Sequence, residues 1–554
     1  MLQQANGLKQ IDIVKMFSDK RCLVIDDFPE IRGSLTRTLK NFGAKTVDTA
    51  AEGQEAIKLC QNKKFDIVIC DYNLGAGKDG QQVLEEVRFL RVLMMTSLFV
   101  MITGEQSREM VLGALECQPD DYITKPYTQA SLKVRLNKAV VRHQALLHIK
   151  KCISDGNYKQ ALQYCNDAIK EGTRYATAIL KIKGQLHFLL KQLKEAQQLY
   201  ESVLGKKPVV WAKLGMGKTL LEQGKLEGAE EMFNSILEED ERYVEAHDML
   251  AELSERKKDR LAAQRHTEKA TEVSPKSVLR HRKLAKLAEF NNDDEQALKS
   301  YQQTIKWGLN SVHESNQDYF NYARKAAQVS SGNNSTESKT LIKQANNVLE
   351  RARKRYSNDD AVAVQAQMVE SQLHRASGDE KRAQNSLSKA RDMYSKLDTP
   401  NVDASLEFAR TLHSFDEEDE ARSVLKDLAM RHSADSELMQ IIDSITSEPI
   451  SEEGRGIATK LTKDGIGAYD SKDFNKAVGV FNEALAAYPN HIGLNLNLIQ
   501  AVLAQVDQDG RSENNVSLVK RSLKAVGTLD SGHQAFKRYS FLMKQVQKLM
   551  PDLL

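Results

Sequence analysis

The residues of this chain best suited to chemistry, three of them acidic, end or follow short apolar runs near its beginning. Asp26 and Asp27 end one run, Asp71 ends a second, Thr103 ends a third and Lys125 follows a fourth. Carboxylates that converge on one point repel one another unless a cation lies between them, and Mg²⁺ prefers such hard oxygen ligands. A carboxylate, an ammonium group, a hydroxyl group and Mg²⁺ in one pocket are the parts needed for phosphoryl transfer onto a carboxylate.

The segments that must position these residues alternate between two patterns. Apolar runs typical of buried parallel strands cover residues 21–26, 66–71, 98–103 and 120–124. Amphipathic stretches typical of helices cover residues 30–42, 52–62, 80–92 and 107–116. Alternation repeated about five times predicts an open parallel sheet covered on both faces. Ligands of such sheets bind beyond the carboxyl ends of the strands, where the acidic residues fall.

The order of these residues carries a resemblance to a known family. The chain contains, in order, an acidic pair (Asp26-Asp27), a single acidic residue (Asp71), a hydroxyl residue (Thr103), an aromatic residue (Tyr122) and a Lys-Pro pair (Lys125-Pro126). Over residues 20–127 the chain resembles the receiver domain of bacterial two-component response regulators. The resemblance implies a flavodoxin-like α/β fold with a five-stranded parallel sheet in the order 2-1-3-4-5.

The resemblance also implies a role for each site residue. Asp71 would be the phosphoacceptor that attacks a phosphohistidine on a sensor histidine kinase. Lys125 would pair with the acyl phosphate, while Thr103 and Tyr122 would move toward it as a switch. Mg²⁺ would be the cofactor, and its ligands would be Asp26, Asp27, Asp71 and the backbone carbonyl of Asn73. Family precedent further predicts a cis peptide bond between Lys125 and Pro126.

Four positions bear on the details of this resemblance. Gly75 stands where many receivers have proline, in a loop that looks one residue longer than usual. Gly104 stands where alanine is commoner and leaves room for a phosphoryl group. Asn73 and Glu105 resemble chemotaxis-type receivers, and that pair implies a short-lived phosphoryl state.

Beyond residue 145 the pattern changes to paired amphipathic helices with an internal period. Small residues recur about every 34 positions, at Ala161, Ala196, Ala229, Ala263 and Ala297. Most are followed four positions later by a larger residue, and several are preceded twelve positions earlier by a small one. This period resembles tetratricopeptide repeats, in which small residues let helices touch and large residues fill the gap to the next unit. The period predicts an all-α solenoid of roughly eight to ten units.

The clearest single copy of the repeat lies late in the chain, where seven residues fall at the expected offsets. They are Gly465, Tyr469, Phe474, Ala477, Phe481, Ala484 and Pro489. We therefore divide the chain into a receiver (20–127), a connecting helix (128–154), repeats (155–310), degenerate repeats (311–446), a hinge (447–456) and final repeats with a capping helix (457–554).

The connecting stretch contains neither glycine nor proline. Apolar residues keep a helical spacing at Leu132, Leu136, Val140, Leu147 and Ile149. The pattern predicts that the last receiver helix continues into the first repeat, which would make a stiff joint rather than a flexible linker.

Repeats of this kind bind peptides or helices of partner proteins in a groove lined by the first helix of each unit. The period places Lys181, Gln185, Lys218, Arg282 and Lys286 at groove positions. Ordinary solvated helix faces would carry the same residues, so both interpretations stay open. The sequence does not name the partner.

Three other classes of protein are disfavoured by sequence features: nucleotide binders, nucleic-acid binders and membrane-spanning proteins. The segment GMGKT at 215–219 resembles the end of a nucleotide-binding loop, but Ala212 stands where that motif needs glycine. A net charge of +3 on 554 residues is small for a nucleic-acid binder. No apolar run reaches the ~18 residues of a membrane span, and no signal peptide is visible. Six scattered cysteines without CxxC spacing fit a cytoplasmic location.

These observations lead to two hypotheses. In the first, the chain is a cytoplasmic response regulator: a histidine kinase phosphorylates Asp71, and the repeats give a protein-binding output. The receiver would then catalyse only its own phosphoryl transfer and hydrolysis, and the chain would not be a turnover enzyme. In the second, the chain is a phosphorylation-independent adaptor whose receiver serves for docking or dimerisation. The sign of regulation and the oligomeric state stay open at this stage.

Overall fold

The computed structural model describes residues 17–18, 20–104, 116–527, 529 and 531–553. The helix expected over 107–116 lies outside the described residues except for Glu116, and Glu105 lies outside them too. The chain divides into two compact units, of which the first comprises residues up to 287 together with 302–314. The second comprises 288–301 and the residues from 315 onward.

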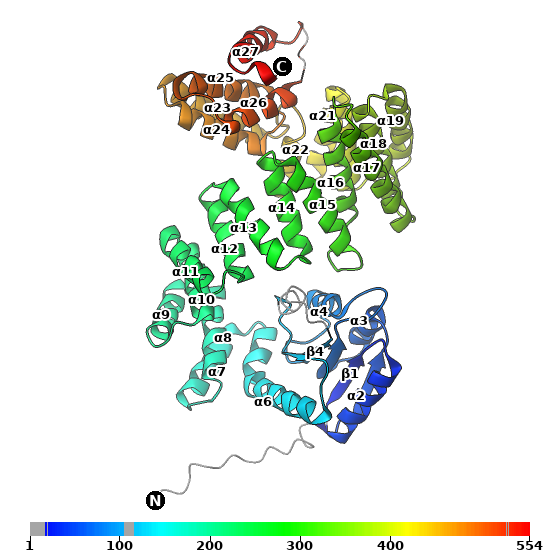
Figure 1. The fold of residues 1–554 in the computed structure, drawn as a ribbon, viewed down its shortest axis with the longest axis vertical. Coiled ribbons are helices and arrows are strands. Elements are labelled where there is room, and N and C mark those ends of the chain that lie inside the picture. Colours follow the sequence, from blue (N-terminus) through cyan, green and yellow to red (C-terminus); the bar gives the residue numbers. More distant parts are fainter. Residues whose placement is uncertain (1–16, 19, 105–115, 528, 530, 554) are drawn as a thin grey trace, which may run out of the picture. The chain divides into compact units, whose positions relative to one another are not determined.

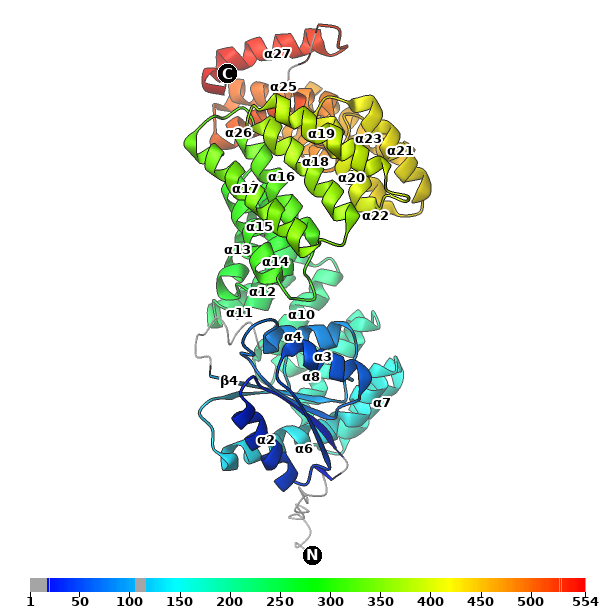
Figure 2. The same cartoon turned by 90° about the vertical axis from the view of Figure 1, so that its right-hand side faces the viewer.

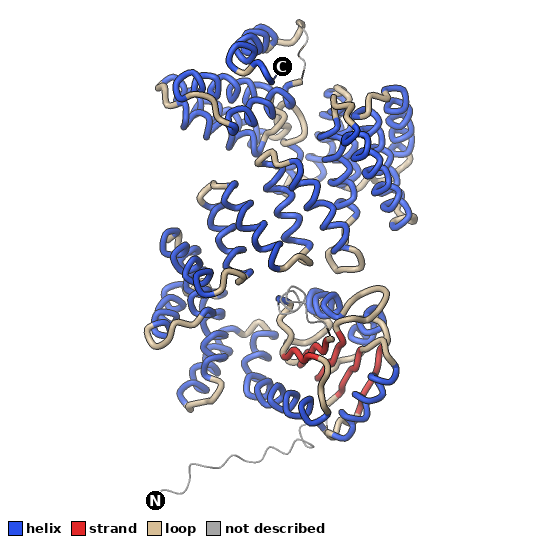
Figure 3. Tube along the Cα trace, viewed as in Figure 1, coloured by secondary structure: helices blue, strands red, loops and turns tan. Residues whose placement is uncertain are grey.

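A five-stranded parallel sheet forms the centre of the N-terminal α/β domain. Its strands are β1 (Arg21–Ile25), β2 (Thr46–Ala50), β3 (Ile67–Asp71), β4 (Leu98–Thr103) and β5 (Asp121–Thr124). They pair in the order β2-β1-β3-β4-β5, and every neighbouring pair is parallel (Figure 1). This is the flavodoxin-like order, so the predicted fold class is confirmed. Among the described residues, strands occur in this domain alone (Figure 3).

Strand β2 is the one strand that the apolar pattern did not pick out. It is the edge strand on one side of the sheet, and its sequence TVDTA is mostly half-exposed, with Ala50 its one buried residue. An edge strand needs no continuous apolar run, so a search for the apolar runs of central parallel strands does not detect β2.

Successive side chains of the central strands enter two different cores. Val24 and Ile69 pack on one face with helices α2 (Pro29–Asn41) and α6 (Gln129–Ser154). Leu23 and Val68 pack on the other face with α3 (Gly53–Asn62) and α4 (Gly80–Phe89), and Figure 2 gives a second view of these layers. Because side chains alternate along a strand, a strand with helices on both faces must be apolar throughout.

Helix α6 belongs to two cores at once. Leu132 and Leu136 are buried in the α/β domain, whereas Leu146 and Ile149 are buried against α7 (Tyr158–Lys170) and α8 (Ala176–Leu189). The helix runs unbroken over the stretch for which a continuous helix is predicted. One detail differs from the prediction: Leu147 is only half-buried, and its neighbour Leu146 takes the core position.

Polar contacts fix the middle of α6 to the α/β domain. Arg135 pairs with Asp121 at 2.8 Å, and Lys150 pairs with Asp120 at 3.0 Å. His143 contacts the carbonyl oxygen of Thr96 at 2.7 Å. The start of β5 and the residue before it are therefore tied to α6 at two points along the helix.

The residues that follow α6 form antiparallel helices, which we call the helix array. In the first unit the array continues with α9 (Leu193–Leu204), α10 (Val210–Glu222), α11 (Leu226–Glu239), α12 (Val244–Arg256) and α13 (Arg260–Val273). Helices α14 (Val278–Phe290) and α15 (Asp294–Gly308) contribute residues to both units. The second unit holds α16 (Asn316–Ser330), α17 (Thr336–Arg355), α18 (Asp360–Ala376), α19 (Glu380–Ser395), α20 (Val402–Ser414), α21 (Glu418–Arg431), α22 (Ser436–Asp443), α23 (Glu452–Asp470), α24 (Phe474–Ala487), α25 (Ile492–Asp509), α26 (Glu513–Val526), α27 (Phe536–Leu549) and the short 3₁₀ turn η1 (Pro551–Leu553).

Small and large residues meet across the helix pairs as the 34-residue period predicts. A Cβ atom added to Gly217 would lie 2.4 Å from the ring of Phe233, and one added to Gly465 would lie 2.4 Å from the ring of Phe481. Both phenylalanines are buried. The absence of a side chain at each glycine is therefore what lets the aromatic ring enter the pair.

Two segments are more regular than the sequence indicates. The polar stretch 330–338 narrows to a loop of 331–335, because α17 begins at Thr336. Of the segment 447–456, the part from Glu452 onward is already helical in α23. The carboxylate of Asp443 accepts hydrogen bonds from the backbone N–H groups of Ile450 and Ser451 at 2.7 and 2.8 Å, which fastens the loop before α23.

Two alternative functions can be compared with the helices. The segment GMGKT lies inside α10, where the Thr219 hydroxyl donates to the Gly215 carbonyl at 2.8 Å, so it does not form a phosphate-binding loop. None of the helices in the described part of the chain is both long and apolar enough to cross a membrane.

Candidate functional site

Three carboxylates meet at the carboxyl ends of two adjacent strands. Asp26 and Asp27 directly follow β1, and Asp71 is the last residue of β3. One oxygen from each of the three lies within 4.8 Å of the others. Asp26 is 1% exposed and Asp71 is 6% exposed, so this negative charge is concentrated in a largely dry place. The predicted convergence of these residues is present.

An ammonium group from the end of β5, two strands away from β3, faces this acidic cluster. Lys125 follows β5, and its Nζ lies 2.9 Å from Asp71 Oδ1 and 3.4 Å from Asp26 Oδ2. The Lys125 N–H donates to the carbonyl oxygen of Thr103 at 2.6 Å, which fixes the start of the loop. The Lys125-Pro126 peptide bond is cis, as family precedent predicts.

Burial and the charge of Lys125 act in opposite directions on the pKa of Asp71. Burial raises the pKa of the Asp71 carboxyl, and the neighbouring Asp26 and Asp27 add to this, while the hydrogen bond and charge of Lys125 lower it; the pKa stays above its usual value. Burial lowers the pKa of Lys125, but Asp71 and Asp26 outweigh that effect and raise it. Lys125 is therefore a permanent cation that only partly offsets the acidic cluster.

The acidic cluster has the donor set of a divalent cation site. Among the described residues, Lys125 is the one ammonium group that pairs with these three carboxylates, so negative charge is in excess. Asp27 Oδ1 is buried and accepts no hydrogen bond from any described residue. A buried oxygen of this kind costs free energy unless something cationic or hydrogen-bonding reaches it. Hard oxygens around a small dry site fit Mg²⁺.

Of the remaining predicted residues, Thr103 and Asn73 lie beside the cluster, whereas Tyr122 lies against the adjoining core. Thr103 is buried at the end of β4 and lines the same cavity as Asp71, as does Asn73. The Asn73 side chain is exposed, and its Oδ1 accepts from the Gly75 N–H at 3.2 Å. Tyr122 is half-buried and packs against the core beneath α3 and α4.

The loop after Asp71 explains why glycine replaces the usual proline. Gly75 has φ +71° and Gly77 has φ +104°, both in the left-handed region. Proline is held near φ −65°, so it could not adopt the conformation of Gly75. The path of this loop therefore excludes proline at position 75.

Helix α4 begins in direct contact with the backbone of Asp71, a feature that the sequence pattern missed. Asp79 caps the helix, accepting from the Gln82 N–H at 2.8 Å, while the Gln82 side chain accepts from the Asp79 N–H at 3.1 Å. A Cβ atom on Gly80 would lie 2.2 Å from the carbonyl oxygen of Asp71. Glycine at this position allows the helix to approach the acceptor strand.

Comparison with known proteins identifies the domain that carries this site. A family model described as a response regulator receiver domain matches residues 22–137. The chain is 31% identical over 122 residues to the chemotaxis protein CheY-3 of Vibrio cholerae, covering 92% of that protein and 22% of this chain. The chain belongs to the response regulator receiver family. The receiver domain is also similar to a CheY-like receiver structure from Methanospirillum hungatei (27% identity, 96% of that chain and 23% of this one, TM-score 0.21) and to CheY4 of Vibrio cholerae (28% identity, 98% of that chain and 22% of this one, TM-score 0.20).

The predicted groove residues of the helix array differ in their surroundings. Lys181 and Gln185 on α8 are exposed, as is Lys286 on α14, whereas Lys218 on α10 is half-buried. Arg282 donates a hydrogen bond to the carbonyl oxygen of His313, so it takes part in an internal contact of the first unit. Arg282 is therefore the weakest of the five candidates for binding a partner.

Residues of the helix array also reach the receiver site, and the sequence carried no signal for this. Lys276, Lys306 and Trp307 line the same cavity as Asp71 and Lys125. They lie about 150 to 240 positions from those residues along the chain, and all of them belong to the first unit. No local pattern relates residues at such a distance.

Proposed function

We propose that the chain is a cytoplasmic two-component response regulator in which a sensor histidine kinase phosphorylates Asp71. The observation that supports this most strongly is the meeting of three carboxylates with Lys125 at one end of the receiver sheet. A scaffold used only for docking has no need of so costly a concentration of buried negative charge.

The proposed reaction transfers a phosphoryl group from nitrogen to oxygen. A carboxylate oxygen of Asp71 attacks the phosphorus of a phosphohistidine, and the phosphorus–nitrogen bond breaks. The departing imidazole nitrogen keeps the bonding electrons and takes up a proton from solvent. Lys125, already 2.9 Å from Asp71, pairs with the transferred oxygens, and the Thr103 hydroxyl donates to them. Water later cleaves the acyl phosphate, so the receiver acts on itself and not as a turnover enzyme.

Mg²⁺ is the cofactor that this site would hold. Asp26, Asp27, Asp71 and the backbone carbonyl of Asn73 are the proposed ligands. When bound, the ion supplies the positive charge that offsets the carboxylates and the phosphoryl oxygens. The buried and unpartnered Asp27 oxygen and the excess negative charge support this assignment.

The proposed output is protein binding by the helix array, which we interpret as tetratricopeptide repeats. The close packing of Gly217 on Phe233 and the 34-residue period support that interpretation. Exposed Lys181 and Gln185 are the better-placed groove candidates. Helix α6, shared by the receiver core and the first array helices, would carry a change at the receiver to the array.

Labelling with a small phosphodonor tests the proposed function. The full chain is incubated with acetyl phosphate and Mg²⁺, and the phosphorylated residue is located by mass spectrometry. Asp71→Asn should abolish labelling, because it removes the nucleophile. Asp48→Asn is the matched control, since Asp48 pairs with Lys63 at 2.8 Å on edge strand β2, away from the site. Removing Mg²⁺ with EDTA should also abolish labelling.

Two results would count against the proposal. Equal labelling of the Asp71→Asn and Asp48→Asn variants would place the phosphoryl group elsewhere. A chain that stays unlabelled with acetyl phosphate and with histidine kinases would favour the phosphorylation-independent adaptor.

A further inference from the structure

The cavity beside Asp71 is completed by residues of the helix array. It has a volume of about 700 Å³, and the receiver supplies Asp71 and Lys125 to its lining. The array supplies Lys276, Lys306 and Trp307. Two further cations and an indole ring therefore border the site, in addition to the groups that the receiver provides. The phosphoacceptor lies in a cavity built by two parts of the first unit.

Lys276 of the array contacts two residues that follow the acceptor strand. Its Nζ donates to the hydroxyl of Tyr72, the residue after Asp71, at 2.7 Å and to Asp79 Oδ2 at 3.1 Å. The Lys276 side chain is 13% exposed, and its Nζ lies 5.6 Å from the centroid of the Trp307 ring. An ammonium group has three hydrogens, and among the described residues two are directed at these acceptors. One remains for an acceptor that enters the cavity.

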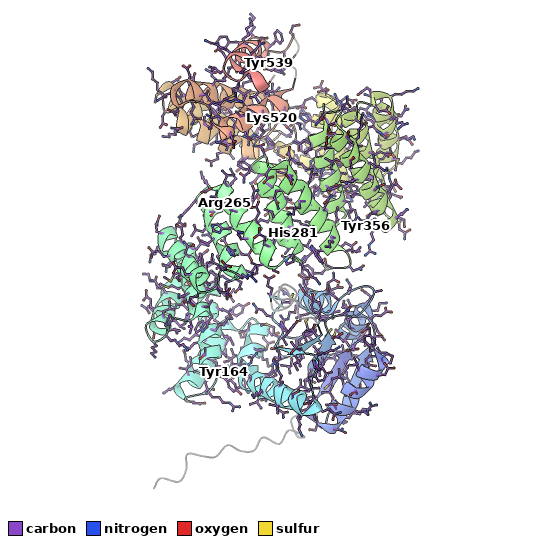
Figure 4. All side chains as sticks on the ribbon, viewed as in Figure 1. Tyr164, Arg265, His281, Tyr356, Lys520 and Tyr539 are labelled. Carbon is purple, nitrogen blue, oxygen red and sulfur yellow. The ribbon has the colours of Figure 1, made fainter. Side chains whose placement is uncertain are left out.

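The loop that carries Lys276 is held rigidly. It joins α13 to α14, and the His281 side chain (labelled in Figure 4) contacts the carbonyl oxygen of Pro275 at 2.7 Å. Arg280 binds Asp248 on α12 through two hydrogen bonds of 2.9 and 2.8 Å and reaches Glu116 of the receiver at 3.3 Å. Because these contacts fix the loop, a displacement of Lys276 would be passed to α12 and α14.

Contacts along α4 extend the same surface. The Gln82 side chain donates to the carbonyl oxygen of Leu309 at 3.1 Å, and His313 lies 3.3 Å from the Glu85 carboxylate. The Phe89 ring meets the His313 ring edge-on, with centroids 5.8 Å apart. The receiver therefore contacts the array at several points, and the contact of Lys276 includes Tyr72, the residue directly after Asp71.

We propose that Lys276 is a phosphoryl-binding residue, supplied by the helix array to the receiver site. The inference rests on the proposed phosphorylation of Asp71. A phosphoryl group on Asp71 brings nearly two negative charges and several strong acceptor oxygens into the cavity. These oxygens compete with Asp79 and Tyr72 for the Lys276 ammonium group, because charge-assisted hydrogen bonds to phosphate are strong. The array thus senses the phosphoryl group by direct contact, in addition to any effect that passes through α6.

Tryptophan fluorescence can follow this contact in the full chain. The sequence has two tryptophans, so a Trp211→Phe variant leaves Trp307, beside Lys276, as the single reporter. That parent is titrated with beryllium fluoride in the presence of Mg²⁺, since the trifluoride complex binds an aspartate as a phosphoryl mimic. We expect a saturable change in Trp307 emission that Asp71→Asn abolishes.

The charge of Lys276 is then removed in the same background. Lys276→Gln should raise the half-saturating fluoride concentration roughly tenfold, about the worth of one charge-assisted hydrogen bond. Lys276→Arg, which keeps the charge, should stay within about threefold of the parent. Lys283→Gln is the matched control: Lys283 is on the same helix array, and its ammonium pairs with Glu255 at 2.7 Å outside the cavity.

The possible outcomes separate this inference from the proposed function. If the Lys276→Gln and Lys283→Gln variants titrate alike while the parent responds, Lys276 is only an interface residue and the inference fails. If the parent gives no response and Asp71 takes no label from acetyl phosphate, the proposed function fails and the inference fails with it. Unchanged hydrogen exchange of α12 and α13 in Lys276→Gln would show that the variant keeps the array folded.

Discussion

Substitution of Gly80 by alanine tests whether close packing of α4 sets the position of the phosphoacceptor. A Cβ atom on residue 80 would lie 2.2 Å from the Asp71 carbonyl oxygen and 3.0 Å from the Tyr72 Cα. Both neighbours are backbone atoms, so neither can rotate away as a flexible side chain would. Ordinary contact begins near 3.4 Å, so the helix and the strand end must separate by about 1 Å.

The expected effect on phosphorylation follows from that displacement. A misplacement of 1 Å between reacting groups can cost about 100-fold in rate, or about 2.7 kcal/mol in the activation barrier. Relaxation of the loop before Asp79 would absorb part of the strain, so we expect Gly80→Ala to slow labelling of Asp71 by roughly 10- to 100-fold.

The assay is the initial rate of acetyl phosphate labelling at saturating Mg²⁺. Gly33→Ala is the matched control, because Gly33 lies within α2 and an added Cβ there meets nothing closer than Arg37 Nη1 at 3.6 Å. Hydrogen exchange of β3 would show whether the variant receiver stays folded. A Gly80→Ala receiver that is folded and labels at the rate of the Gly33→Ala control would refute the claim that this packing positions the acceptor.

Three further predictions concern the helix array and the shared helix. Gly465→Ala should destabilise α23 and α24 by roughly 1–3 kcal/mol, because the added Cβ would overlap with Phe481. Gly467→Ala, which has open space around it, should instead stabilise α23 by up to about 1 kcal/mol. Hydrogen exchange measures both effects, and equal effects would contradict the packing argument. The Glu418 carboxylate accepts hydrogen bonds from His413 of α20 and from Ser447, which precedes α23. Burial by itself would raise the pKa of Glu418, but these hydrogen bonds outweigh it and lower the pKa to about 2. The stabilisation by the Glu418 carboxylate should be complete above about pH 4.5 and lost as the pH falls toward 2. The free energies of unfolding of wild type and Glu418→Gln should therefore differ by roughly 1–2 kcal/mol at pH 6 and converge at low pH. A difference that stays constant with pH would contradict the assignment. Four glycines inserted after Arg142 should stop phosphorylation from altering hydrogen exchange in α7 and α8, and an unchanged response would show that α6 does not transmit it.

Much of the receiver was predictable because its signals are local. A parallel strand buried on both faces must be apolar along its whole length, which made β1, β3 and β4 visible as runs. The acidic residues follow these runs directly, and the ends of parallel strands meet at one edge of the sheet. The edge strand β2 was not predicted, because a strand at the edge of the sheet is partly exposed and needs no continuous apolar run.

The array was predictable in a different way. Its period reflects a packing requirement that is repeated in every unit, so the spacing of residues along the chain is enough to match Gly217 to Phe233. The sequence did not predict which individual residues are buried. Leu146 and Leu147 are adjacent and chemically identical, and the direction of α6 across two cores decides which of them is buried. Loop limits near 331–335 likewise depended on helix capping by Ser335 rather than on composition.

The sequence alone indicated an α/β domain with acidic residues at its strand ends, followed by paired amphipathic helices with a regular period, because strand burial and helix packing each impose a short-range rule on residue types. Tertiary structure alone decided which distant residues share that site. Lys276 is placed beside Tyr72 and Asp79 by the path of the helices between them, and a contact across some 200 positions leaves no local pattern to read. The close approach of Gly80 to Asp71 is of the same kind, because a missing side chain acquires meaning only when its neighbour in space is known.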